Sequence, residues 1–365
     1  MDTQCINSLT AEAVNLLKEM IAIPSSSFNE DEVCGHISRW MSERGIQHER
    51  IGNNIVAERI CDPSQPTLML CAHIDTVEPC EGYSFNPYKP ENCPADMVQG
   101  LGSNDDGASV VSMIAAYRYI IDGSISIKTP MNIILVLTCE EERSGKDGMT
   151  GLWPSLASKV DFAIVGEPTG MRAAIAERGL LVIDAAAEGV SGHAARNEGV
   201  NAIYISLEDI AKLRTHEFAK VSPRMGEVNL NVTQINAGSA HNVIPDRCSF
   251  VIDIRPTEQY TNQEILEELQ AICKSKLTPR NLLNQSSATF ENSPLQKAAD
   301  GLGIETFSSP TTSDWMRISC DAVKMGPGDS ARSHKKDEYV TVDEISSGIK
   351  GYIDFISKLY EHIME

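Results

Sequence analysis

The sequence predicts a two-domain α/β protein, and three observations lead to this prediction. Its 365 residues exceed what one ordinary hydrophobic core organises, so two domains are expected. Apolar strand-like runs alternate with helix-like segments up to about residue 175, which is the pattern of an α/β sandwich. Beyond that point the order becomes strand, helix, strand, strand, helix, strand, which is typical of a small ferredoxin-like unit.

The first domain is expected to begin with two amphipathic helices, over residues 10–23 and 30–42, and Pro24 stops the first of them. Apolar runs then predict short strands, and the residues after Gly107 predict a helix. These strands are expected at residues 55–57, 67–71, 132–137 and 162–165.

The second domain is expected to be an insertion into the first. Its strands are predicted at residues 180–188, 227–235 and 246–254, and its helices at residues 201–213 and 262–276. The chain then returns with a strand at 322–325 and a last helix that opens with a capping box, Thr341 to Glu344. We therefore assign residues 1–177 and 291–365 to a discontinuous first domain and residues 178–290 to the inserted domain.

Composition narrows the classes of function. The net charge of −20 and the pI near 4.8 argue against nucleic acid and anionic membranes as partners, because both repel an acidic surface. No apolar stretch approaches the roughly 20 residues of a membrane span, and the N-terminal residues do not resemble a signal peptide. The ten cysteines form no CxxC pair and lie mostly in apolar runs, which indicates reduced thiols in a cytoplasmic protein.

Polar clusters rich in carboxylates and imidazoles recur after the apolar runs. His73 ends the run 67–71, at the strand end where an open α/β sheet builds its site, and Asp75 lies on the same face of the extended chain. Similar clusters follow at residues 100–107, 138–142, 166–169 and 326–334. Oxygen and nitrogen donors gathered in this way predict a metal site.

In this order, the five clusters resemble those of the dizinc amidohydrolases and exopeptidases, such as acetylornithine deacetylase, succinyl-diaminopimelate desuccinylase and glutamate carboxypeptidase. The resemblance extends from the N-terminal helix to His334 and the last helix. It implies a mixed-sheet α/β/α zinc-hydrolase catalytic domain with an inserted ferredoxin-like lid, through which two chains would form a homodimer.

The resemblance also implies two zinc ions per chain, with cobalt as a possible substitute. Asp105 would bridge the ions, while either Asp105 or Asp106 is expected to cap the helix that follows. The terminal ligands would be His73 and Glu167 for one ion, and Glu142 and His334 for the other.

The stretch Glu140 to Glu142 requires a choice, because adjacent side chains point in different directions. The family pattern makes Glu141 the general base, Glu142 the ligand and Glu140 a supporting residue. Glu141 would take a proton from the attacking water and deliver it to the leaving amine. Asp75 would orient His73 through the far nitrogen of the ring.

Substrate-binding residues are expected mainly in the lid. By resemblance, His193 would reach across the dimer to the oxyanion, and Asn242 and Arg255 would hold the substrate's backbone carboxylate. A surface salt bridge is the alternative for Arg255. Ser313 and Gly328 lie in stretches that resemble substrate-side loops.

The expected reaction is hydrolysis of the amide of an N-acetyl or N-succinyl amino acid of the ornithine or citrulline type, a step of arginine biosynthesis. The segment Gly326 to His334 favours a deacetylase, whereas Lys146-Asp147-Gly148 resembles the desuccinylases of lysine biosynthesis. A metallo-dipeptidase is a third alternative. From a different class, a non-catalytic amino-acid-binding protein on the same fold would be marked by lost ligands, and all five presumed ligands are present.

Overall fold

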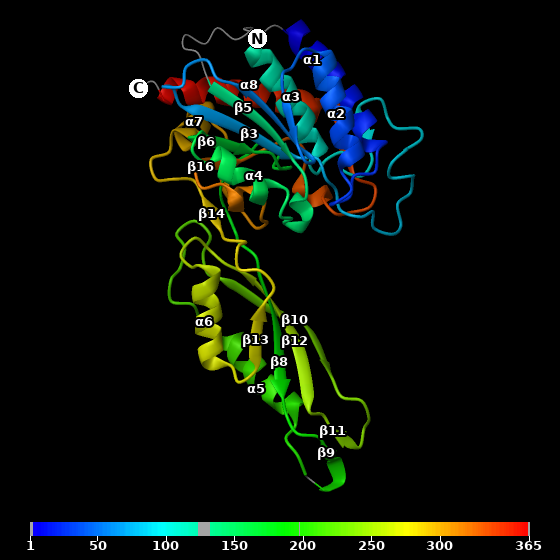
Figure 1. Cartoon of the computed structure of the whole chain (residues 1–365), viewed down its shortest axis with the longest axis vertical. Helices are drawn as coiled ribbons and strands as arrows, with labels where there is room; N and C mark the ends of the chain where they lie inside the picture. The colour runs from blue at the N-terminus through cyan, green and yellow to red at the C-terminus, as the bar shows by residue number, and fades with distance from the viewer. Residues whose placement is uncertain (1–2, 123–131, 197, 364–365) are drawn as a thin grey trace. The chain divides into compact units, whose positions relative to one another are not determined.

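The structure is a computed structural model that describes residues 3–122, 132–196 and 198–363 (Figure 1). It divides into two compact units. The first takes in residues 1–175, 288–307 and 313–365, and the second takes in residues 176–287 and 308–312. Residues 176–177 and 308–312, predicted to belong to the first domain, are grouped with the second unit, and residues 288–290, predicted to belong to the inserted domain, are grouped with the first.

A mixed sheet runs through the first unit. Its strands lie in the order β1 (Glu49–Ile51), β2 (Asn54–Arg59), β5 (Asn132–Thr138), β3 (Thr67–His73), β6 (Phe162–Val165), β16 (Asp321–Lys324), β7 (Ala173–Glu177) and β14 (Ser287–Ala288), with β15 (Thr306–Ser309) beside β7. β3 is parallel to both β5 and β6, while β2 is antiparallel to β5. The predicted mixed-sheet α/β fold is confirmed.

Helices cover this sheet on both faces (Figure 1). On one face lie α1 (Thr3–Ile21), α2 (Asp31–Glu43), α3 (Gly107–Ile121), α7 (Pro294–Leu302) and α8 (Val342–Ile363), and on the other lies α4 (Met149–Leu156). Successive residues of a strand point to opposite faces, so Leu68 and Leu70 of β3 pack among the first set, whereas Met69 and Cys71 pack against α4. Burial on both faces explains why these strands read as continuous apolar runs.

Helix ends differ from the predictions where the signal is weak. α1 begins at Thr3 rather than near residue 10, because Ile6 and Leu9 extend its buried face toward the N-terminus. Asp106 is the N-cap residue of α3, but its side chain makes no capping hydrogen bond, so the predicted carboxylate cap is wrong. The capping box of α8 is confirmed, since Thr341 N donates to Glu344 Oε2 (2.8 Å) and Glu344 N donates to Thr341 Oγ1 (3.1 Å).

The second unit has the predicted order of elements. These are β8 (Leu181–Glu188), α5 (Ala202–Thr215), β10 (Asn229–Ala237), β12 (Arg247–Arg255), α6 (Asn262–Ile272) and β13 (Lys276–Pro279). The antiparallel sheet order β10-β12-β8-β13 is that of a ferredoxin-like unit. Alternate residues of β8, including Leu181 and Ile183, are buried in the unit's own core.

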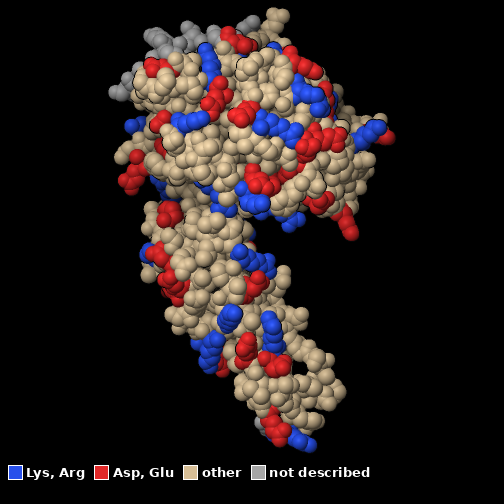
Figure 2. Space-filling model, viewed as in Figure 1, with Lys and Arg blue, Asp and Glu red and all other residues tan. Residues whose placement is uncertain are grey.

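Short strand pairs complete both units. In the first unit, β4 (Met97–Gln99) pairs with β17 (Tyr339–Thr341), and in the second, β9 (Gly192–His193) pairs with β11 (Val243–Ile244). Acidic and basic side chains are interspersed over the face that Figure 2 shows. Among the described residues, the helices are all too short or too polar to cross a membrane.

Candidate metal centre

The centre is assembled at the carboxyl ends of three neighbouring parallel strands. β3 ends at His73, β5 leads into the 3₁₀ turn η1 (Glu141–Arg143), and β6 leads to Glu167. Because parallel strands end at the same edge of a sheet, their following residues meet there. Asp105 joins them from the loop before α3, and His334 joins from the loop after β16.

Two groups of three residues place ligand atoms close enough to hold a metal ion. In each group these atoms lie within 4.8 Å of one another, and Asp105 belongs to both groups. The groups are His73, Asp105 and Glu167, and Asp105, Glu142 and His334. The structure therefore brings together the five residues that the sequence predicts as ligands, with the predicted bridging residue shared.

The two oxygens of Asp105 face different imidazoles. Oδ1 lies 3.2 Å from Nε2 of His73, and Oδ2 lies 3.7 Å from Nε2 of His334. His334 Nε2 also lies 2.9 Å from Glu142 Oε2. One carboxylate oriented toward two donor sets is the arrangement that a dinuclear centre requires.

Electrostatics at this edge favour a bound cation. Burial raises the pKa of Glu141 and of Glu167 well above the usual range, and it also raises the pKa of Glu142. The hydrogen bond with Glu142 raises the pKa of His334 to about 8. Burying several carboxylates side by side is costly unless positive charge accompanies them, and oxygen with imidazole nitrogen is a donor set that zinc accepts. The residues present thus fit a pair of divalent ions.

Asp75 holds more of the centre than the sequence suggests. Its Oδ1 lies 3.4 Å from His73 Nδ1, and its backbone carbonyl lies 3.0 Å from the same nitrogen. The carboxylate also accepts the backbone N–H groups of Glu141 (3.0 Å) and Glu142 (3.1 Å), and the hydroxyl of Ser27 (2.6 Å). Asp75 therefore fixes both the His73 ring and the turn that carries Glu141 and Glu142.

The three adjacent glutamates, residues 140–142, have different neighbours, as expected for side chains that point in different directions. Glu140 has a left-handed backbone (φ 60°), and its side chain accepts the N–H of Asp147 (3.0 Å). Its own N–H donates to the buried Glu30 (3.2 Å). Glu142 contacts His334, while the electrostatic neighbours of Glu141 include His73 and Glu167. Glu141 is thus close to the centre without belonging to either ligand group.

Two buried carboxylates of this region were missed in the sequence. Glu338 accepts the backbone N–H groups of Gly102, Asn104 and Asp105, each at 2.9 Å, and Glu30 supports Glu140. Burial raises the pKa of Glu338 to about 7. Its position four residues after His334 is the only signal that could have drawn attention to it.

Two of the predicted substrate residues, His193 and Asn242, lie at the short β9–β11 ribbon of the second unit, whereas Arg255 is the last residue of β12. His193 pairs with Val243, and the N–H of Ala194 donates to the carbonyl of Asn242 (3.0 Å). Nδ1 of His193 accepts the N–H of Ala195 (3.2 Å), which leaves Nε2 as the ring nitrogen that can donate to another group. An oxyanion contact requires such a donor.

Three further predicted residues have structural partners. Arg255 forms a two-pronged ion pair with Asp253 (2.8 and 3.1 Å), the alternative considered for it. Ser313 is fully buried and accepts the N–H of Trp315 (3.3 Å) at the start of the 3₁₀ helix Asp314–Arg317, which is the environment of a helix cap. Gly328 has φ +90°, and a Cβ there would lie 2.4 Å from Asn104 Oδ1, so its loop requires glycine. Substrate contact by these residues stays a prediction.

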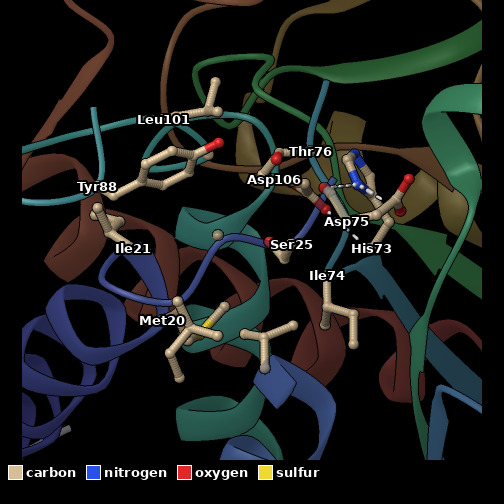
Figure 3. Close-up of a pocket in the computed structure, with 14 residues that line it drawn as sticks. Met20, Ile21, Ser25, His73, Ile74, Asp75, Thr76, Tyr88, Leu101 and Asp106 are labelled. Carbon is tan, nitrogen blue, oxygen red and sulfur yellow. Dashed lines mark hydrogen bonds and ion pairs between the residues drawn. The ribbon is translucent and has the colours of Figure 1, made fainter. Parts of the chain in front are cut away.

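A small cavity of about 20 Å³ adjoins His73 (Figure 3). Apolar side chains such as Leu101 line one part of it, and Thr76 and Asp106 line another. This volume suits one water-sized molecule and excludes an amino acid. The side chain of His334, in contrast, is 54% exposed, so the centre is accessible to a substrate from the His334 side.

Comparison with known families gives two matches within the chain. Residues 175–281 match the family described as peptidase dimerisation domain, and residues 54–160 match the family described as peptidase family M28. The first match covers most of the second unit, and the second contains His73 and Asp105.

Curated relatives are similar over nearly the whole chain. A peptidase M20 domain-containing protein of Schizosaccharomyces pombe is 26% identical over 93% of this chain and 82% of the relative. A succinyl-diaminopimelate desuccinylase of Wolbachia pipientis is 25% identical over 96% of this chain and 94% of the relative. An acetylornithine deacetylase of Photorhabdus laumondii is also 25% identical, over 96% of each chain.

Solved structures share the fold at lower identity. The aminopeptidase PepT of Bacillus cereus has a TM-score of 0.78 at 17% identity, covering 96% of this chain and 99% of that one. An M20 family metallo-carboxypeptidase of Sulfolobus solfataricus has a TM-score of 0.75 at 16% identity, covering 99% of each chain. A Bacillus subtilis protein described as a dinuclear metal-binding M20 peptidase has a TM-score of 0.72 at 15% identity, covering 98% of each chain.

Proposed function

Because the chain belongs to the M20 peptidase family, we propose that it hydrolyses the amide bond of an N-acyl amino acid with two zinc ions as cofactors. The observation that carries the proposal is the pair of ligand groups that share Asp105. Zinc is proposed from the donor set, and cobalt prefers similar ligands.

The roles of the individual residues follow from their positions. Asp105 would bridge the ions, with His73 and Glu167 on one side and Glu142 and His334 on the other. When bound, the ions supply Lewis-acid polarisation of the scissile carbonyl and lower the pKa of water.

Glu141 is the proposed general base and acid. It lies beside both ligand groups without belonging to either, and burial raises the pKa of its carboxyl well above the usual range. A raised pKa brings a carboxyl closer to the range in which it can accept and return a proton near neutral pH. Glu141 would take the proton of the attacking water and deliver it to the amine as the carbon–nitrogen bond breaks, leaving a carboxylate and a free amino acid.

We propose that the active form is a homodimer joined through the second unit, which the dimerisation-domain match supports. His193 would donate from Nε2 to the oxyanion in the partner's site, while Asn242 and Arg255 would hold the substrate's carboxylate. For Arg255 this role requires that the guanidinium contact a substrate in addition to Asp253, or exchange partners.

The preferred substrates are N-acetyl- or N-succinyl-ornithine and -citrulline, and the proposed setting is arginine biosynthesis in the cytoplasm. Succinyl-diaminopimelate is the second candidate, because a desuccinylase and a deacetylase are equally similar to the chain at 25% identity. Dipeptides are a third, since the solved structures of the same fold include peptidases.

A substrate panel tests the proposal. The zinc-loaded protein is offered acetyl and succinyl derivatives of ornithine, citrulline, lysine and diaminopimelate, together with simple dipeptides, and amine release is measured. Release from an acyl amino acid that a chelator abolishes is the expected result. A protein that binds zinc and releases amine from none of these compounds would contradict the proposed reaction and would favour a binding protein.

A further inference from the structure

Glu338 is a buried carboxylate near the centre that has no proposed role in binding metal or substrate. It accepts three backbone N–H groups, from Gly102, Asn104 and Asp105, each at 2.9 Å. These groups belong to the loop that ends in the shared ligand Asp105. Leaving a buried backbone N–H without a partner is costly, so these three hydrogen bonds to one side chain fix the backbone path of that loop.

The same residue belongs to the loop that carries another ligand. Glu338 follows His334 by four positions. The segment from His334 to Glu338 includes two non-glycine residues with left-handed backbone, His334 (φ 57°) and Asp337 (φ 58°). Such conformations persist only where surrounding contacts enforce them. Among these contacts, Asp337 accepts the N–H and the hydroxyl of Ser84 (2.7 and 3.0 Å).

Further hydrogen bonds join the loop that contains Asp105 to the loop that contains His334. The N–H of Gly100 donates to the carbonyl of Glu338 (2.9 Å), and the strand pair β4–β17 continues the connection. On the far side of His334, Asn104 exchanges two hydrogen bonds with the backbone of Asp329 (2.9 and 3.1 Å). The Asp105 loop and the His334 loop are therefore held as one body.

We propose that Glu338 is a positioning residue that couples the two metal sites by fixing the Asp105 loop to the His334 loop. The inference rests on the proposed function, because it assumes that these residues bind metal. Asp105 serves both ligand groups, so displacing its loop weakens both sites, and the group that also contains His334 is weakened more. Partners of metal ligands commonly change metal affinity by roughly 10–100-fold when they are replaced.

The test compares Glu338→Gln and Glu338→Ala with a matched control, Asp209→Asn. Asp209 is a buried carboxylate of the second unit that also accepts backbone N–H groups, from Lys274 (2.9 Å) and Ser275 (2.7 Å). Glutamine keeps the size of Glu338 and one acceptor oxygen, so the Glu338→Gln variant should fold more readily than Glu338→Ala. If the alanine variant does not fold, the result for Glu338→Gln alone tests the inference. Full-length chelator-treated proteins are titrated with Zn²⁺, and the visible spectrum of each Co²⁺ form is recorded.

The expected result is that both Glu338 variants bind Zn²⁺ at least about 10-fold more weakly and show an altered Co²⁺ spectrum, while Asp209→Asn binds as the wild type does. Wild-type affinity in Glu338→Gln would overturn the inference and leave the proposed function intact. An equal loss in Asp209→Asn would also overturn it, because the effect would then be general destabilisation. Failure of the wild-type chain to bind Zn²⁺ would overturn the proposed function and this inference with it.

Discussion

Replacing Asp75 by asparagine tests how the centre is held together. The carboxylate is almost fully buried. Its Oδ1 accepts the N–H of Glu141, and its Oδ2 accepts the N–H of Glu142. An asparagine side chain offers one oxygen and one NH₂ group. Whichever way the amide is turned, a donor then faces a backbone N–H, and one of the two hydrogen bonds is lost.

The magnitude follows from these contacts. A hydrogen bond to a charged group contributes roughly 1.5–3 kcal/mol, so the free energy of unfolding should fall by about that amount. The η1 turn carries the proposed base and one proposed ligand, and the His73 ring loses its charged neighbour at 3.4 Å. Zinc affinity and turnover should therefore each fall by roughly 10–100-fold.

Glu140→Gln is the matched control, because Glu140 lies in the same segment but accepts the N–H of Asp147 instead of contacting the centre. Chemical denaturation, zinc titration and amine release are measured for both variants. Turnover and zinc affinity should stay near wild type in Glu140→Gln. Unchanged turnover in Asp75→Asn, or an equal loss in Glu140→Gln, would refute the assignment of Asp75 as the residue that fixes the turn.

Three further predictions concern single residues. Glu141→Ala should keep bound zinc while turnover falls roughly 10²–10⁴-fold, whereas Glu142→Ala should lose zinc. Elemental analysis and amine release are measured for both variants. If Glu141→Ala loses zinc and Glu142→Ala keeps it, the roles of base and ligand are assigned to the wrong one of these two residues. Gly328→Ala should be destabilised by roughly 1–3 kcal/mol in chemical denaturation, because the new Cβ would lie 2.4 Å from an oxygen. Gly303 also has a left-handed backbone (φ +66°), but no atom of the described residues lies within 4 Å of a Cβ built there, so Gly303→Ala should be destabilised less. Equal losses of stability in the two variants would contradict the steric argument. Mixing His193→Ala with Glu141→Ala should restore part of the activity in mixed dimers, and no recovery after verified subunit exchange would mean that His193 does not serve the partner's site.

The sequence predicted the fold and the place of a metal site because both depend on one regularity, whereas the individual ligands were implied by the resemblance to the dizinc hydrolases. Parallel strands buried on both faces read as apolar runs, and their ends meet at one edge of the sheet. Residues 73 and 167 could therefore be placed at the same edge of the sheet although they lie 94 positions apart in the sequence. The order of elements in the second unit was predictable for a similar reason, since alternation of buried and exposed residues marks its strands.

The supporting carboxylates could not be predicted, because they contact backbone N–H groups, which have no sequence signature. Glu338 reads as an ordinary loop glutamate and Glu30 as the first residue of a helix until the segments that they hold are in place. The prediction that the Asp106 side chain caps α3 is wrong for a related reason. Its Oδ2 accepts the N–H of His73 (3.3 Å), so a tertiary contact replaced the local one.

Anomalous scattering from crystals of the zinc-loaded protein tests the central claim most directly. Two zinc peaks roughly 3.5 Å apart are expected, one on each side of the Asp105 carboxylate, with His73 and Glu167 at one peak and Glu142 and His334 at the other. A single peak, or two peaks that do not share Asp105, would contradict the dinuclear centre on which the proposed chemistry depends.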